Sequence, residues 1–97
     1  METMWLVLIE VVAQTGTPPE PEIGFMNVTT WADSKVTASA KIGQYLESFG
    51  WHLVSVEKAS VIDEDAECDE VLRDMIERTS TNQNAIILGT FHTYKTN

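Results

Sequence analysis

The chain has 97 residues, of which 15 are acidic and 6 basic, so its formal net charge is −9 at pH 7. Hydrophobic residues make up 43% and charged residues 22% of the sequence, which is typical of one small globular domain over residues 1–97. The negative charge argues against nucleic acid or a membrane surface as partner, because phosphate groups would be repelled.

Cysteine usage and the N-terminal residues predict a cytoplasmic protein. Cys68 is the single cysteine, so no internal disulfide can form, and a free thiol suits a reducing compartment. The apolar stretch at residues 4–9 follows no basic region and is far shorter than the roughly 20 apolar residues that span a bilayer. We therefore expect neither a secretion signal nor a membrane-spanning segment.

The first two expected elements are strands. In residues 4–13 every odd position is apolar and every even position except Glu10 is apolar, which predicts a strand in the centre of a sheet. Residues 14–24 contain all three prolines, so we expect an extended surface loop there. Residues 25–31 alternate in polarity and predict a second strand, antiparallel to the first.

A helix and a third strand follow. Asp33 or Ser34 can cap a helix over residues 35–49, and Gly50 is the expected stop. The apolar face of this helix has the 3–4 spacing of Ala38, Ile42, Tyr45, Leu46 and Phe49. Residues 51–62 predict a strand in which the apolar positions change phase after Leu53, which indicates a bulge or a strand covered on both sides.

The C-terminal third predicts a second helix over residues 65–79 and a last strand over residues 85–94, followed by a polar tail at 95–97. Six of the eight residues 63–70 are acidic. Their spacing does not match a calcium-binding loop, whereas carboxylates in a first helical turn stabilise a helix through its dipole. The apolar stripe of this helix is formed by Cys68, Val71, Leu72, Met75, Ile76 and Thr79, so we expect the thiol to be buried and inert.

The element order, strand-strand-helix-strand-helix-strand, predicts an α+β fold. We expect a two-layer sandwich in which a four-stranded sheet carries both helices on one face. Element order and size resemble a ferredoxin-like layout with the first helix displaced. Such a layout leaves the other sheet face bare and apolar, which predicts a homodimer through that face.

Candidate site residues gather at the end of the last predicted strand. Thr90, His92 and Tyr94 share one face by strand alternation, and Gly89 indicates a bulge or a close backbone approach. With Tyr45 or Trp31 nearby they would line a small-ligand pocket in which His92 transfers protons. The alternative interpretation is an edge strand that leaves the core.

Other motifs are weak. His52, Cys68 and His92 are too far apart in sequence for a zinc site, so we expect no metal and no cofactor. The tryptophans at positions 5, 31 and 51 are core anchors or, if exposed, mark an interface. The chain has no phosphate-binding glycine loop, nucleophile elbow or paired cysteines.

Three functional hypotheses follow, and the sequence leaves open whether the protein is an enzyme. The leading one is a homodimeric module that binds a protein or a small molecule without catalysis. The alternative is a small dimeric ferredoxin-like enzyme with a pocket at Thr90, His92 and Tyr94. A further alternative, resting on net charge alone, is an acidic inhibitor or immunity-type protein that covers a basic surface.

Overall fold

The first third of the chain forms a long two-stranded hairpin. The structure is a computed structural model, and it describes residues 2–15, 20–62 and 69–93. Strands β1 (Thr3–Thr15) and β2 (Glu20–Ala32) pair antiparallel from end to end. The loop predicted over residues 14–24 is therefore wrong for residues 14–15 and 20–24, which are strand, whereas residues 16–19 lie outside the described residues. Pro21 is tolerated because no other described strand pairs with β2 at this end.

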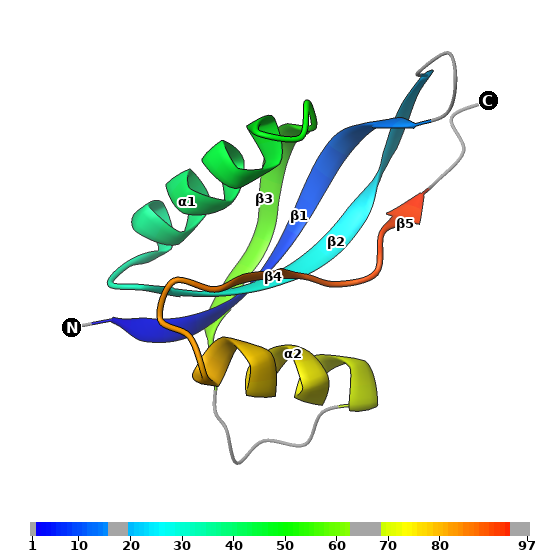
Figure 1. Cartoon of the computed structure of the whole chain (residues 1–97). Helices are drawn as coiled ribbons and strands as arrows, with labels where there is room; N and C mark the ends of the chain where they lie inside the picture. Colours follow the sequence, from blue (N-terminus) through cyan, green and yellow to red (C-terminus); the bar gives the residue numbers. More distant parts are fainter. Residues whose placement is uncertain (1, 16–19, 63–68, 94–97) are drawn as a thin grey trace.

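Five strands and two helices make up the described fold (Figure 1). The remaining elements are α1 (Lys35–Glu47), β3 (His52–Val61), α2 (Glu70–Ser80), β4 (Ile86–Leu88) and β5 (His92–Thr93). The antiparallel sheet has the order β3-β1-β2-β4, and β5 also pairs with β2. The α+β class and the central position of β1 are thus confirmed.

The two helices lie on opposite faces of the sheet, so the prediction of two helices on one face is wrong (Figure 1). Helix α1 packs its buried residues against the odd-numbered face of β1, which carries Val7, Ile9 and Val11. Helix α2 contacts the even-numbered face, where Thr79 is hydrogen-bonded to Thr29. The right-handed crossover rule applies to α1, which joins the parallel strands β2 and β3, but it does not fix the face of α2, because β3 and β4 run antiparallel.

Strand β3 contains the irregularity that its apolar pattern indicates. Its register against β1 shifts between Leu8 and Ile9 and again between Glu10 and Val11, which leaves Glu57 and Val54 as the extra residues. Because of these two bulges, three apolar residues of β3 all pack against the α1 core: Leu53, Val56 and Ala59.

Helix α1 begins where predicted and ends two residues early. Ser34 caps it by accepting a hydrogen bond from the amide of Thr37 at 3.2 Å. The helix ends at Glu47, and Gly50 has φ +80, the left-handed conformation expected of a glycine stop. Phe49 therefore lies beyond the helix and is 49% exposed, and Tyr45 packs against its ring instead of entering the core.

Helix α2 begins at Glu70, five residues later than predicted. Asp69 has extended backbone and caps the helix, with its Oδ1 atom accepting a hydrogen bond from the amide of Leu72 at 2.8 Å. One turn further along the exposed side of the helix, Asp74 and Arg78 approach to 3.7 Å. Residues 63–68, with the predicted buried Cys68, lie outside the described residues.

The predicted last strand is divided into β4 and β5 by residues 89–91. Gly89 donates its amide hydrogen to the Asn27 carbonyl at 2.8 Å, and a Cβ atom at this position would lie 2.9 Å from the same oxygen. The close backbone approach expected at Gly89 is thus confirmed. Tyr94 and the tail at 95–97 lie outside the described residues.

Candidate functional site

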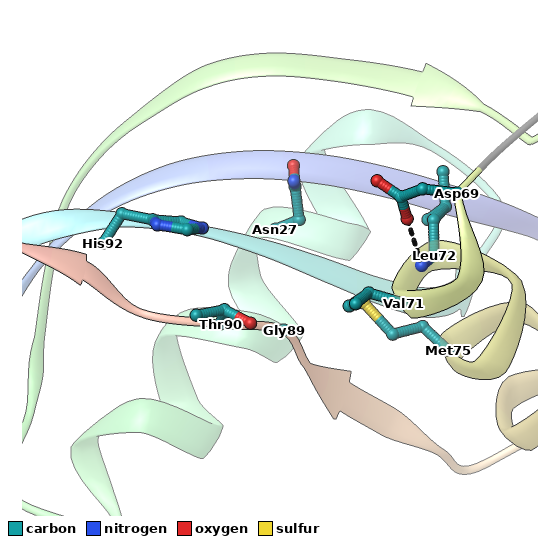
Figure 2. Close-up of a pocket in the computed structure, with 8 residues that line it drawn as sticks. All are labelled: Asn27, Asp69, Val71, Leu72, Met75, Gly89, Thr90 and His92. Atoms are coloured by element: carbon teal, nitrogen blue, oxygen red, sulfur yellow. Dashed lines mark hydrogen bonds between the residues drawn. The ribbon is translucent and has the colours of Figure 1, made fainter.

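A hollow of about 290 Å³ lies between the N-terminal half of α2 and the chain that joins β4 to β5 (Figure 2). We call it the α2 hollow. It is lined by Asn27, Asp69, Val71, Leu72, Met75, Gly89, Thr90 and His92. Helix α2 and the β4–β5 connection thus meet beside β2, which contributes Asn27 to the hollow.

The floor and ends of the α2 hollow are fixed by backbone contacts. Asn27 lies on the α2 side of β2, because its register partner is Leu8 on the even-numbered face of β1. The hydrogen bond from Gly89 to the Asn27 carbonyl brings the β4–β5 connection against β2. His92 pairs with Phe25, and the N-cap bond holds Asp69 at the start of α2.

The far end of α2 is attached to the sheet by buried hydrogen bonds. The Thr79 hydroxyl lies 2.7 Å from that of Thr29, and the Thr79 carbonyl accepts a bond from the indole of Trp31 at 2.7 Å. The N-terminal half of the helix lies over the hollow, where Val71 remains 56% exposed. The hollow therefore exists because α2 is attached tightly at one end and only lightly at the other.

The α2 hollow combines one charge, several neutral polar groups and an apolar wall. Asp69 is the only one of the described lining residues that is formally charged at pH 7. The neutral groups are the amide of Asn27, the hydroxyl of Thr90 and the imidazole of His92. Helix α2 supplies the apolar wall with Val71, Leu72 and Met75. The site can therefore accept hydrogen bonds and cover a short apolar group at the same time.

The predicted pocket residues are brought together in part. Thr90 and His92 both line the α2 hollow, whereas Tyr94 lies outside the described residues. Trp31 is on the same face but donates its indole hydrogen to Thr79 at the other end of α2, and Tyr45 belongs to α1 on the opposite face.

Sequence reasoning missed Asn27, Asp69 and the apolar wall. The spacing of the acidic residues explained Asp69 through the helix dipole, and this is compatible with its role as the cap. What the sequence does not show is that residue 27 of β2 and residue 69 lie on the same hollow. That proximity depends on which sheet face α2 covers.

The two histidines lie near the same end of the sheet but on its two outer sides. His52 pairs with Val12 on β1, and His92 pairs with Phe25 on β2, so β1 and β2 separate them. Within the described ranges no three histidine, cysteine, aspartate or glutamate side chains gather as a metal site would require.

Part of the even-numbered sheet face is left uncovered by α2. We call this part the open face, and it is formed by six half-buried residues: Leu6, Leu8, Glu10, Val12, Ile23 and Phe25. A second hollow of about 250 Å³ lies over Leu6 and Leu8 and is bounded by Asn27, Lys58 and Ser60. The bare face expected from the sequence is thus reduced to the area beyond α2.

The open face carries charges of both signs. Glu10 lies in its middle, and the Ser55 hydroxyl lies 3.5 Å from its Oε1 atom and 3.1 Å from Oε1 of Glu57. Lys58 pairs in register with Leu8 and is exposed beside it. The open face is therefore mostly apolar, with the Glu10 carboxylate inside it and the charges of Lys58 and Glu57 along its β3 border.

Comparison with known proteins yields no relative. No protein-family model, curated protein or solved structure matches this chain. The two described helices have 13 and 11 residues, and neither is long and apolar enough to cross a lipid bilayer. Any statement about function therefore rests on the two surfaces described above.

Proposed function

We propose that the protein is a cytoplasmic, non-catalytic binding module that pairs with a second copy of itself through the open face. The observation that carries this proposal is the incomplete cover of the sheet: α2 protects Thr29 and Trp31, while Leu6, Leu8 and Val12 remain half-exposed beyond it. Contiguous apolar surface on a sheet is costly to leave in water and is typical of an interface.

The charges on the open face suit a second copy of the same chain. Two chains with a net charge of −9 each repel one another in general, so the contact needs local compensation. A twofold axis makes a patch face itself, and Lys58 of each copy can then meet Glu10 or Glu57 of the other.

Face-to-face contact is favoured over edge pairing. Strand β3 is an outer strand of the sheet, and its bulges at Val54 and Glu57 interrupt the regular ladder that edge-to-edge pairing would need. Bulges and charged side chains are common means of protecting an edge strand. The open face instead presents five apolar side chains around Glu10.

Catalysis at the α2 hollow has less support. Thr90 and His92 are both exposed, and no described side chain forms a hydrogen bond that would orient the imidazole. General acid–base catalysis depends on an imidazole held by a second group. The residues of the hollow therefore favour ligand binding over proton transfer.

The mass of the protein in solution tests the proposal. Light scattering coupled to size-exclusion chromatography is expected to give the mass of two chains at about 50 μM, because the interface is modest and its affinity is in the micromolar range. Leu8→Glu is expected to give one chain, since it places a like charge on both sides of the axis. The milder Val12→Thr, which keeps a β-branched side chain in the strand, is expected to weaken association at least threefold.

The matched control is Val36→Glu, the same kind of change on α1 at a position that is 79% exposed and away from the open face. Its mass is expected to remain that of two chains. Circular dichroism of each variant shows whether the chain still folds. A single-chain mass for the unmodified protein at every concentration would overturn the proposal, as would equal effects of Leu8→Glu and Val36→Glu.

A further inference from the structure

We propose that the α2 hollow binds a small aliphatic ammonium ion, with the charged nitrogen at Asp69 and the carbon chain against α2. This inference goes beyond the dimer, because none of the six residues that form the open face lines the α2 hollow, although Asn27 lies at the border of both surfaces. It rests on the pairing of a single carboxylate with an apolar wall in one hollow.

Charge decides the sign of the ligand. Among the described residues that line the hollow, Asp69 is the one that is formally charged, and none is a lysine or an arginine. Its Oδ1 atom holds the helix cap, and a carboxylate has further acceptor sites for a second donor. The net charge of −9 also raises the local concentration of cations over anions. An anionic ligand is therefore disfavoured.

The other lining groups distinguish an ammonium ion from a metal ion. Calcium and magnesium require six or more oxygen ligands and take several carboxylates, whereas the described lining of the hollow offers one. These two cations also find no oxygen ligand on the side chains of Val71, Leu72 and Met75. The same three apolar side chains can cover methylene groups, whose transfer out of water is favourable in free energy.

The hollow is arranged as an elongated site. Asp69 and His92 lie at its two ends with Asn27 between them, as Figure 2 shows. An ammonium group at Asp69 places its carbon chain along Leu72 and Met75. The other end of the ligand then reaches Thr90 and His92, whose neutral side chains accept hydrogen bonds. A second amino group or a hydroxyl group on the ligand can therefore donate a hydrogen bond at this far end.

The size of the hollow limits the ligand to a few carbon atoms. Pockets for drug-sized molecules begin at roughly 300 Å³, and this one has about 290 Å³ and is open on one side. A ligand with so few atoms binds weakly, so we expect a dissociation constant on the order of 1 mM. Nuclear magnetic resonance detects binding in this range.

The test is a titration of the ¹⁵N-labelled protein with 1,5-diaminopentane in about 150 mM NaCl, which screens distant charges. Amide shifts are expected at Asp69, Leu72, Gly89 and Thr90. The neutral analogue 1,5-pentanediol, of nearly the same shape, is expected to bind at least tenfold more weakly because it lacks the charge-assisted bond to Asp69. Equal shifts with the diol would overturn the assignment of a cation.

The variant Asp69→Asn removes the charge and keeps the helix, because asparagine is as good an N-cap as aspartate. It is expected to weaken binding of the diamine about tenfold. Glu77→Gln is the matched control: it changes the net charge equally on an exposed position of the same helix and is expected to change binding less than twofold. An equal loss in both variants, or no shift at 10 mM diamine, would overturn the proposal.

The two proposals fail independently. Val12→Thr, which is expected to weaken the dimer, adds no charge and leaves every described lining residue of the α2 hollow unchanged. Diamine binding by this variant, measured at a concentration where it is a single chain, is expected to match that of the unmodified protein within twofold. A monomer that still binds the diamine overturns the dimer alone, whereas a dimer without diamine binding overturns the ammonium site alone.

Discussion

Thr79 is the residue that attaches α2 to the sheet. Its hydroxyl lies 2.6 Å from the Met75 carbonyl and 2.7 Å from the Thr29 hydroxyl, and all three residues are buried. A hydroxyl has one hydrogen, so if Thr79 donates to Met75 then Thr29 donates to Thr79. The Trp31 indole completes the attachment through the Thr79 carbonyl. The α2 hollow depends on this attachment because it fixes where the other end of α2 lies.

Removal of one hydroxyl from this pair tests the attachment. Thr29→Val keeps the shape of the side chain but removes the hydrogen-bond partner of a buried hydroxyl, which is expected to cost about 1–2 kcal/mol in the free energy of unfolding. Urea unfolding measures this cost. Thr81→Val, at an exposed position, is the control and is expected to change the stability by less than about 0.5 kcal/mol.

The double variant Thr29→Val, Thr79→Val sharpens the same test. Because it removes both partners, it leaves no unpaired hydroxyl between β2 and α2. The loss is therefore expected to be smaller than the sum of the two single losses. Additive losses would contradict a direct bond between the two side chains.

At the scale of elements, two glycines of the α1 region have opposite requirements. Gly50 has φ +80, where any other residue is strained, although nothing lies within 4 Å of a Cβ atom there. Gly43 is inside α1, and a Cβ atom would meet the side chain of Leu53 at 3.6 Å, an ordinary contact. Backbone conformation, and not space, therefore distinguishes the two positions.

The same substitution is expected to have opposite effects at these two glycines. Gly50→Ala is expected to destabilise the protein by about 1 kcal/mol, because alanine disfavours the left-handed conformation. Gly43→Ala is expected to stabilise it by about 0.5–1 kcal/mol through a higher helix propensity. Thermal unfolding of both variants supplies the comparison, and a shift of the same sign in both would show that the end of α1 is assigned incorrectly.

Local patterns predicted the elements but not how far each extends. Alternation and 3–4 spacing are local properties, so they located β1, β2 and α1 and indicated the bulge in β3. Proline content wrongly predicted a loop at Pro21, where pairing with Gln14 continues the hairpin. The 3–4 spacing likewise predicted that α1 continues to Phe49, whereas the helix ends at Glu47. The spacing of apolar residues indicates a helix but does not mark its last residue.

The candidate site was predictable only where it depends on neighbours in sequence. Thr90 and His92 were found because they follow one another along a predicted strand. Asn27 and Asp69 join them through strand order and through the face that α2 covers, which no local pattern contains. The prediction of two helices on one face failed for the same reason.

At the scale of the whole molecule, repulsion among the excess carboxylates destabilises the compact folded state. The 15 acidic and 6 basic side chains cannot be paired one to one, and the pair Asp74–Arg78 is highly exposed and contributes little. Folding brings these charges closer together than they are in the unfolded chain. Salt that screens the repulsion is therefore expected to favour the folded state.

The dependence of stability on salt tests this balance. Raising NaCl from 10 to 300 mM is expected to increase the free energy of unfolding by about 1 kcal/mol, measured by urea unfolding of samples kept at one protein concentration. The variant Glu47→Gln, Glu77→Gln removes two exposed carboxylates and is expected to show a smaller dependence on salt. Thr81→Val, which changes no charge, is expected to keep the full dependence. A stability that falls as salt rises would show that attractive ion pairs outweigh the repulsion, and the acidic surface would then stabilise the fold.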